Sequence, residues 1–240
     1  MELNKQKWTK KDIDEFNDYL FSLNHLQTAK WTQKIYSTKK ECLAIKVPVL
    51  RDIAKEISKG DAISFFNLQS HKYIEDDILT ACIISLLKDY SLQKLQTTEF
   101  LKNVDSWVCT DTLKLNDKKE PFENVYNFSY NLLQSKYLYL RRFAFVQLLK
   151  CAKNKECINK MFGLVELAHL EQEYYVNMAI AWLLCEIMIF YPAETLKFLN
   201  NYKNKYKETN NIFVLKQTIS KCRDSFRISE ENKILLKKLL

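Results

Sequence analysis

Apolar residues recur along almost the whole chain at intervals of three and four residues, the spacing of an amphipathic α-helix. This pattern predicts a succession of helices joined by short connections. The expected helices lie near residues 10–23, 28–37, 48–58, 61–67, 73–88, 91–101, 105–114, 121–134, 138–151, 155–168, 173–190, 192–202, 208–221 and 229–240.

Several of these helices have residues at their ends that favour a helix terminus. Thr9 is a typical N-cap, and acidic residues follow it. Proline is tolerated in a first helical turn, where three prolines are expected: Pro48, Pro121 and Pro192. Gly60 is typical of a residue that ends a helix.

Glycine and proline are scarce, with 2 Gly and 3 Pro in 240 residues, whereas an average chain has about 12% of the two together. This scarcity argues against sheets with tight turns and against glycine-rich phosphate loops. Helix pairs recur every 35 to 40 residues or so, as in a HEAT-like or ARM-like α-solenoid of antiparallel helix pairs. A compact irregular bundle would show the same periodicity. No linker divides the chain, so residues 1–240 are expected to form one domain.

The chain carries a formal charge of +8, which favours a polyanionic partner, although many basic proteins bind no nucleic acid. Seven cysteines and three histidines show no metal-ligand or disulfide spacing, so no metal or cofactor is expected. The basic N-terminus does not resemble a signal peptide. The apolar stretch from Met178 to Tyr191 is too short to span a bilayer. We therefore expect a cytoplasmic protein with no membrane partner.

Three segments interrupt apolar helix faces with polar or aromatic residues. In the first, Trp107 and Asp111 lie four residues apart, on one face of a helix capped by Asp105 or Ser106. An indole beside a carboxylate suits the stabilisation of a cation. The alternative is a core tryptophan with a solvated aspartate one turn later.

The second segment places Arg141 and Arg142 at the start of an apolar helix, where they would contact phosphates or pair with internal acids. In the third, Trp182 stands among small and apolar residues, which is usual for a core position. The acidic run from Glu75 to Asp77 is most simply a first helical turn that complements the helix dipole.

Together, these segments resemble the AlkD-type family of DNA alkylation repair proteins. The resemblance covers roughly residues 40–220, and its segments keep the order and similar intervals of the family. The segments that carry it are Val47–Glu56, Asp105–Trp107 with Asp111, Leu140–Phe143, and Tyr175–Glu186 with Trp182.

The resemblance implies a HEAT-like solenoid whose concave basic face grips duplex DNA. It also implies a monomeric, nucleoid-associated DNA glycosylase that hydrolyses the N-glycosidic bond of cationic N3- or N7-alkylated purines. By position, Asp111 matches the catalytic carboxylate and Arg142 the phosphate-contacting arginine, with Arg141 beside it. Trp107 and Trp182 match the aromatic residues that flank the deoxyribose of the lesion.

The chain departs from this pattern at two positions. Active members often carry basic residues four before and three after the second tryptophan, where this chain has Met178 and Cys185. The competing interpretation is a non-catalytic HEAT-like module that binds branched or damaged DNA, or a protein partner.

Overall fold

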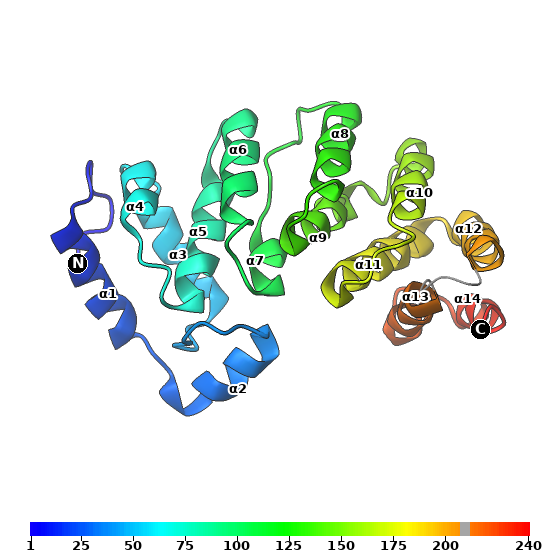
Figure 1. Cartoon of the computed structure of the whole chain (residues 1–240), viewed down its shortest axis with the longest axis horizontal. Coiled ribbons are helices and arrows are strands. Elements are labelled where there is room, and N and C mark those ends of the chain that lie inside the picture. Colours follow the sequence, from blue (N-terminus) through cyan, green and yellow to red (C-terminus); the bar gives the residue numbers. More distant parts are fainter. Residues whose placement is uncertain (207–211) are drawn as a thin grey trace. The chain divides into compact units, whose positions relative to one another are not determined.

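The computed structural model describes residues 1–206 and 212–240. Within these residues the regular structure is helical, and a single isolated bridge joins Glu41 to Tyr73. The helices follow one another along the chain (Figure 1). Their bounds are α1 Lys10–Ser22, α2 Leu26–Tyr36, α3 Val47–Ile57, α4 Ala62–Leu68, α5 Ile74–Leu86, α6 Tyr90–Phe100, α7 Trp107–Thr112, α8 Phe122–Leu133, α9 Leu138–Val146, α10 Ile158–Leu167, α11 Tyr174–Phe190, α12 Pro192–Lys205, α13 Ile212–Asp224 and α14 Glu230–Lys237. Two 3-10 turns, η1 (Leu149–Cys151) and η2 (Lys155–Cys157), lie between α9 and α10.

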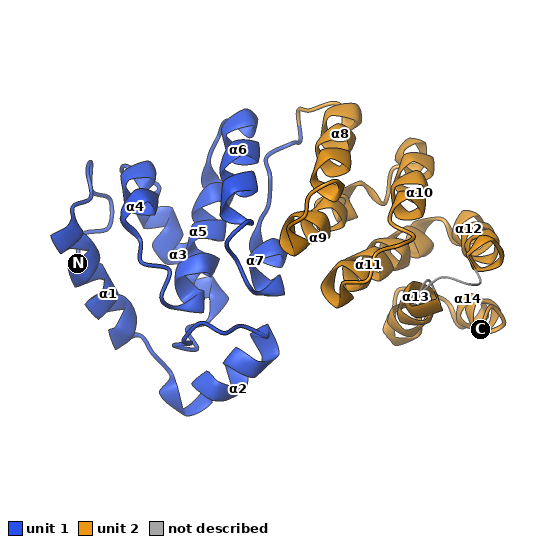
Figure 2. Ribbon diagram, in the orientation of Figure 1, with its two compact units in different colours: residues 1–118 blue, residues 119–240 orange. Residues whose placement is uncertain are grey.

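The predicted all-α class is confirmed, and the helices form two compact units, residues 1–118 and 119–240 (Figure 2). In unit 1, α3 packs against α5 and α5 packs against α7. The helix α5 is the centre of this row, because its side chains from Ile74 to Ile84 are all buried. The rings of Trp8, Phe16 and Phe65 pack edge to face beside it in the same core.

Unit 2 repeats this arrangement with a second row of helices, in which α9 packs against α11 and α11 against α13. Each helix of the row pairs with a neighbour in the chain: α8 with α9, α12 with α11, and α14 with α13. Such stacked pairs are the arrangement of an α-solenoid. The concave basic face and the single domain over 1–240 stay predictions.

Most of the expected helix ends agree with the structure to within about two residues. The Thr9 hydroxyl accepts from Asp12 N at 3.3 Å, while Asp12 Oδ2 accepts from Thr9 N at 2.8 Å, which completes a capping box. The expected helix over 138–151 ends earlier, at Val146, and η1 follows it. The expected helix over 208–221 begins partly outside the described residues.

Gly60 has a different role from the predicted one. The helix α3 ends at Ile57, and Gly60 does not adopt a left-handed conformation. Instead, a Cβ atom at residue 60 would lie 2.2 Å from the carbonyl oxygen of Lys5. The N-terminal segment therefore runs directly over this backbone, and Asp61 N donates a 2.8 Å hydrogen bond to the same oxygen. The close approach, not helix termination, requires glycine here.

Candidate functional site

The helix α7 presents one short face to solvent, and this face carries Trp107 and Asp111. Both residues are half-buried, whereas Val108, Cys109, Thr110 and Thr112 are buried. Ser106 is the N-cap, and its hydroxyl accepts from Val108 N at 3.3 Å. The predicted helical face in unit 1 is therefore present, and the indole and the carboxylate lie one turn apart on it.

The edge of the Trp107 ring is fixed by a hydrogen bond to the preceding part of unit 1. Its Nε1 atom donates to the backbone oxygen of Ile35 at 3.0 Å. The Tyr36 ring meets the indole edge to face, with 6.0 Å between ring centroids. The Thr110 hydroxyl donates to Trp107 O at 2.7 Å and lies 3.2 Å from Asp111 Oδ1. The contacts from Ile35 and Tyr36 orient the indole before any ligand binds.

The segment that follows α2 is bound to the entrance of α7, which the sequence pattern did not predict. Ser106 Oγ donates to Tyr36 O at 2.6 Å. The carboxylate of Asp105 accepts from Thr38 Oγ1 at 2.6 Å and from Lys39 N at 2.7 Å. The two residues that were candidate caps of α7 therefore also tie residues 36–39 to it.

The acidic run at the start of α5 is buried rather than solvated. Glu75 accepts from the backbone N–H groups of Leu43 and Ile45 at 3.0 and 3.3 Å. Asp77 lies 2.6 Å from Lys40 Nζ and 2.9 Å from His71 Nδ1. These carboxylates therefore hold residues 40–45, between α2 and α3, while Asp105 holds residues 38 and 39. A run of acidic residues in a sequence does not reveal such distant partners.

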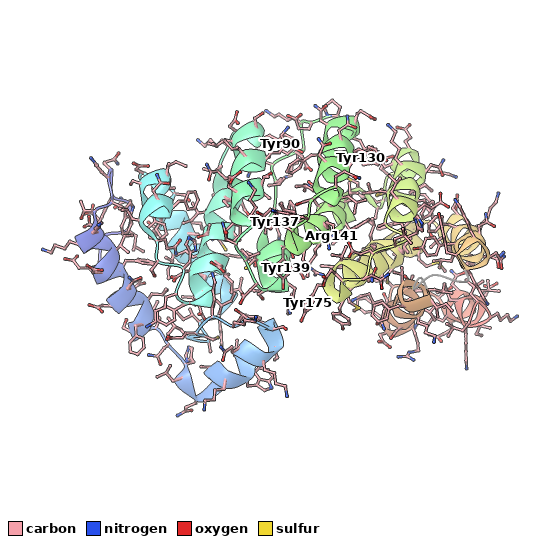
Figure 3. The ribbon with its side chains drawn as sticks, viewed as in Figure 1. Tyr90, Tyr130, Tyr137, Tyr139, Arg141 and Tyr175 are labelled. Atoms are coloured by element: carbon pink, nitrogen blue, oxygen red, sulfur yellow. The ribbon has the colours of Figure 1, made fainter. Side chains whose placement is uncertain are left out.

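Within unit 2, Arg142 and Arg141 leave α9 in different environments. Arg142 is 5% exposed and its Nη1 donates to Tyr175 O at 2.6 Å, which links α9 to α11. Arg141 is half-buried and binds Glu171 through two contacts, Nε to Oε2 at 2.7 Å and Nη2 to Oε1 at 3.3 Å. Arg141 and Tyr139 extend from the start of α9 and Tyr175 from the start of α11 (Figure 3).

The pairing of Arg141 with Glu171 has an electrostatic consequence. Burial would raise the pKa of Glu171, but the hydrogen bonds from Arg141 and from the backbone N–H of Glu173 outweigh it, so this pKa is lowered. Glu171 is therefore an ionised partner of Arg141. A phosphate that binds Arg141 competes with this carboxylate.

Trp182 lies on the one stripe of α11 that reaches solvent. Residues 175, 178, 182, 186 and 189 are half-buried and follow the helical period, while Ala179 and Ala181 beside the indole are fully buried. The indole is thus partly accessible. Met178, one turn earlier on the stripe, carries no charge, and Glu186, one turn later, forms an ion pair with Arg227.

Cys185 lies away from this stripe and is buried against α13. The hydrogen bond from the Cys222 thiol lowers the pKa of Cys185, and the charges of Lys221 and Arg227 act in the same direction. Neither Met178 nor Cys185 supplies the positive charge expected beside Trp182.

Within the described part of the chain, no three His, Cys, Asp or Glu side chains gather as metal ligands. No described helix has the length and apolar character needed to cross a membrane. A family model described as DNA alkylation repair enzyme matches residues 17–215. The chain belongs to the DNA alkylation repair enzyme family.

Membership of the DNA alkylation repair enzyme family supports a role as a DNA repair enzyme and implies DNA as its partner. Searches of curated proteins and of solved structures gave no match. The matched residues include all of the predicted site: Trp107, Asp111, Arg141, Arg142 and Trp182. The structure places the first two together on α7 of unit 1 and the other three on the packed helices α9 and α11 of unit 2. Their convergence on one surface stays a prediction.

Proposed function

We propose that this protein is a DNA glycosylase that releases cationic N3- or N7-alkylated purines from duplex DNA. The observation that carries the proposal is the accessible face of α7, where the oriented Trp107 indole and the Asp111 carboxylate lie one turn apart. A family role in alkylation repair supports this assignment.

The chemistry requires stabilisation of a cation rather than an acid catalyst. An alkylated purine already carries positive charge, so it departs without protonation. The glycosidic bond breaks, and its electron pair moves onto the purine and cancels that charge. A water oxygen bonds to C1′ of the sugar, and its proton passes to Asp111 or to solvent.

Positive charge grows on the deoxyribose while the glycosidic bond lengthens. In the proposal, Asp111 stabilises this charge electrostatically and the faces of Trp107 and Trp182 add cation–π attraction. Arg142 and Arg141 contribute phosphate contacts, which set the register of the DNA and carry no sequence information. This division of roles predicts sequence-independent binding that weakens as salt concentration rises.

The test is single-turnover release of N7-methylguanine from methylated duplex DNA. We expect Asp111→Asn to slow release by about 10²–10³-fold and to leave DNA affinity nearly unchanged, because the carboxylate acts on charge that is complete only in the transition state. Asp18→Asn, an exposed carboxylate on α1, is the matched control. Equal rates for Asp111→Asn and the parent would remove Asp111 from the mechanism. A parent that binds DNA but releases no purine would favour the non-catalytic module.

A further inference from the structure

The connection between α13 and α14 projects a phenylalanine into solvent. Phe226 is 94% exposed, whereas Cys222 and Ile228, four residues before and two after it, are 0% and 4% exposed. Ser225 N donates to Cys222 O at 3.3 Å, and Arg227 N donates to Ser225 Oγ at 3.3 Å. Both ends of the connection are thus anchored, and the apolar ring is held away from the core.

Two arginines flank this ring in the sequence. Arg223, three residues before Phe226, is exposed and pairs with its neighbour Asp224, which is also exposed. Arg227 follows Phe226 directly and is exposed as well. Surface pairs of this kind are weakly held, so both guanidinium groups are available to a stronger anion.

Arg227 also places this connection beside the solvent-facing stripe of α11. Its Nη2 atom contacts Glu186 Oε2, and Glu186 lies one turn after Trp182. The sequence of α11, from Tyr174 to Phe190, contains no Lys or Arg. The positive charge in contact with the Glu186 end of this stripe therefore comes from the α13–α14 connection.

An exposed aromatic ring flanked by arginines has the chemistry that recognises a nucleic acid. Phosphates pair with guanidinium groups, and apolar side chains enter the minor groove and pack against sugars and base edges. A protein partner would need a wider apolar surface, whereas the residues beside Phe226 are charged or polar.

We propose that Phe226, with Arg223 and Arg227, forms a second DNA contact of unit 2, in which the ring enters the minor groove and the arginines bind the phosphates on either side. The proposal rests on the DNA-directed role of the protein. It does not require glycosylase activity.

The test is the affinity of the full chain for an unmodified 20-base-pair duplex, measured by fluorescence anisotropy over a series of salt concentrations. We expect Phe226→Ala to weaken binding about fivefold to tenfold and Phe226→Trp to bind like the parent, because an aromatic ring is retained. Leu95→Ala, an exposed apolar residue on α6, is the control and should leave affinity unchanged.

The contribution of Arg227 is tested both with and without its ion-pair partner, Glu186. Arg227→Ala should weaken binding and make the slope of log affinity against log salt shallower by about one, and Arg227→Lys should restore the slope. Combining Glu186→Gln with Arg227→Ala separates loss of the phosphate contact from exposure of the Glu186 carboxylate. Lys197→Ala, on α12, removes one exposed positive charge elsewhere in unit 2.

Phe226 is solvent-exposed, so its replacement should leave the melting temperature unchanged, and weaker binding then reports a lost contact. Equal affinities for Phe226→Ala and the parent overturn the inference. If that occurs while the parent still releases alkylpurine, only the inference fails. If Phe226→Ala weakens binding and the parent releases no alkylpurine, the inference stands and the proposed glycosylase fails.

Discussion

The indole N–H of Trp107 donates a 3.0 Å hydrogen bond to the carbonyl oxygen of Ile35, the second-last residue of α2. This carbonyl belongs to the last turn of α2, where backbone oxygens have no partner within the helix. The proposed substrate-binding indole therefore also caps a helix. The contacts that orient it, from Ile35 and Tyr36, lie within unit 1.

Trp107→Phe should destabilise the chain by about 1 kcal/mol, because Ile35 O loses its donor while an aromatic ring remains. Urea unfolding measures the change. Base release should slow as well, because the phenyl ring is no longer held by the hydrogen bond. A variant with parental stability and parental release would show that this hydrogen bond does not position the ring.

Arg142→Ala should lower both stability and DNA affinity. Removal of a buried, charged donor from Tyr175 O should cost about 1.5–3 kcal/mol of unfolding free energy. If Arg142 also contacts phosphate, affinity falls to a similar degree for all sequences and the salt slope becomes shallower by about one. An unchanged salt slope with reduced stability would restrict Arg142 to the link between α9 and α11.

The lowered pKa of Glu171 predicts a dependence of stability on pH. Because the folded pKa lies below the usual value of about 4.3, this group stabilises the fold above that pH. The contribution is lost as pH falls through the folded pKa. Glu171→Gln should therefore lose about 1.5–3 kcal/mol at pH 7 and progressively less, relative to the parent, as the pH is lowered below 4.

Chemical denaturation of both proteins at each pH provides the measurement. Glu230→Gln is the control, since Glu230 pairs with Lys233 at an exposed position where an ion pair contributes little. A loss of unfolding free energy in Glu171→Gln that is the same at pH 7 and below pH 4 would contradict the role of Glu171 as an ionised partner of Arg141.

Replacement of Ala44 by glycine should stabilise the protein. Its φ angle is 59°, in the left-handed region that is costly for residues with a Cβ atom. Glycine relieves this strain but loses more entropy on folding, so Ala44→Gly should raise stability by about 0.5–1 kcal/mol. Ala54→Gly, within α3, should do the opposite. Thermal melting of the two variants gives the sign directly, and a loss at both positions would refute the strain argument.

Helix number and type were predictable because the apolar period continues through nearly every element. The environment of the charged residues was not predictable from this period. The first-turn position of Glu75 and Asp77 was expected, but their burial depends on Lys40, His71 and the backbone of residues 43–45, which only the fold brings close. Likewise, the sequence left Arg141 open to phosphate or an internal acid, and the structure identifies Glu171 as the acid.

The site residues show the same difference between local spacing and contacts that depend on the fold. A four-residue spacing was sufficient to place Trp107 and Asp111 on one face of a helix. The hydrogen bond from Trp107 to Ile35 spans 72 positions in the chain, and no local pattern encodes it. The exposure of Phe226 is not predictable for a related reason: an exposed phenylalanine and a core phenylalanine look identical in a sequence.

The two glycines of the chain differ sharply in what surrounds them. A Cβ atom at Gly163 would meet nothing within 4 Å, whereas one at Gly60 would overlap the Lys5 carbonyl. In a library of all single substitutions selected for folded protein, position 163 should accept most residues and position 60 almost none. The first residues of the chain thereby impose a constraint on a position more than fifty residues later. An amino-terminal deletion past Lys5 should relax it, making position 60 permissive while the deletion itself lowers stability.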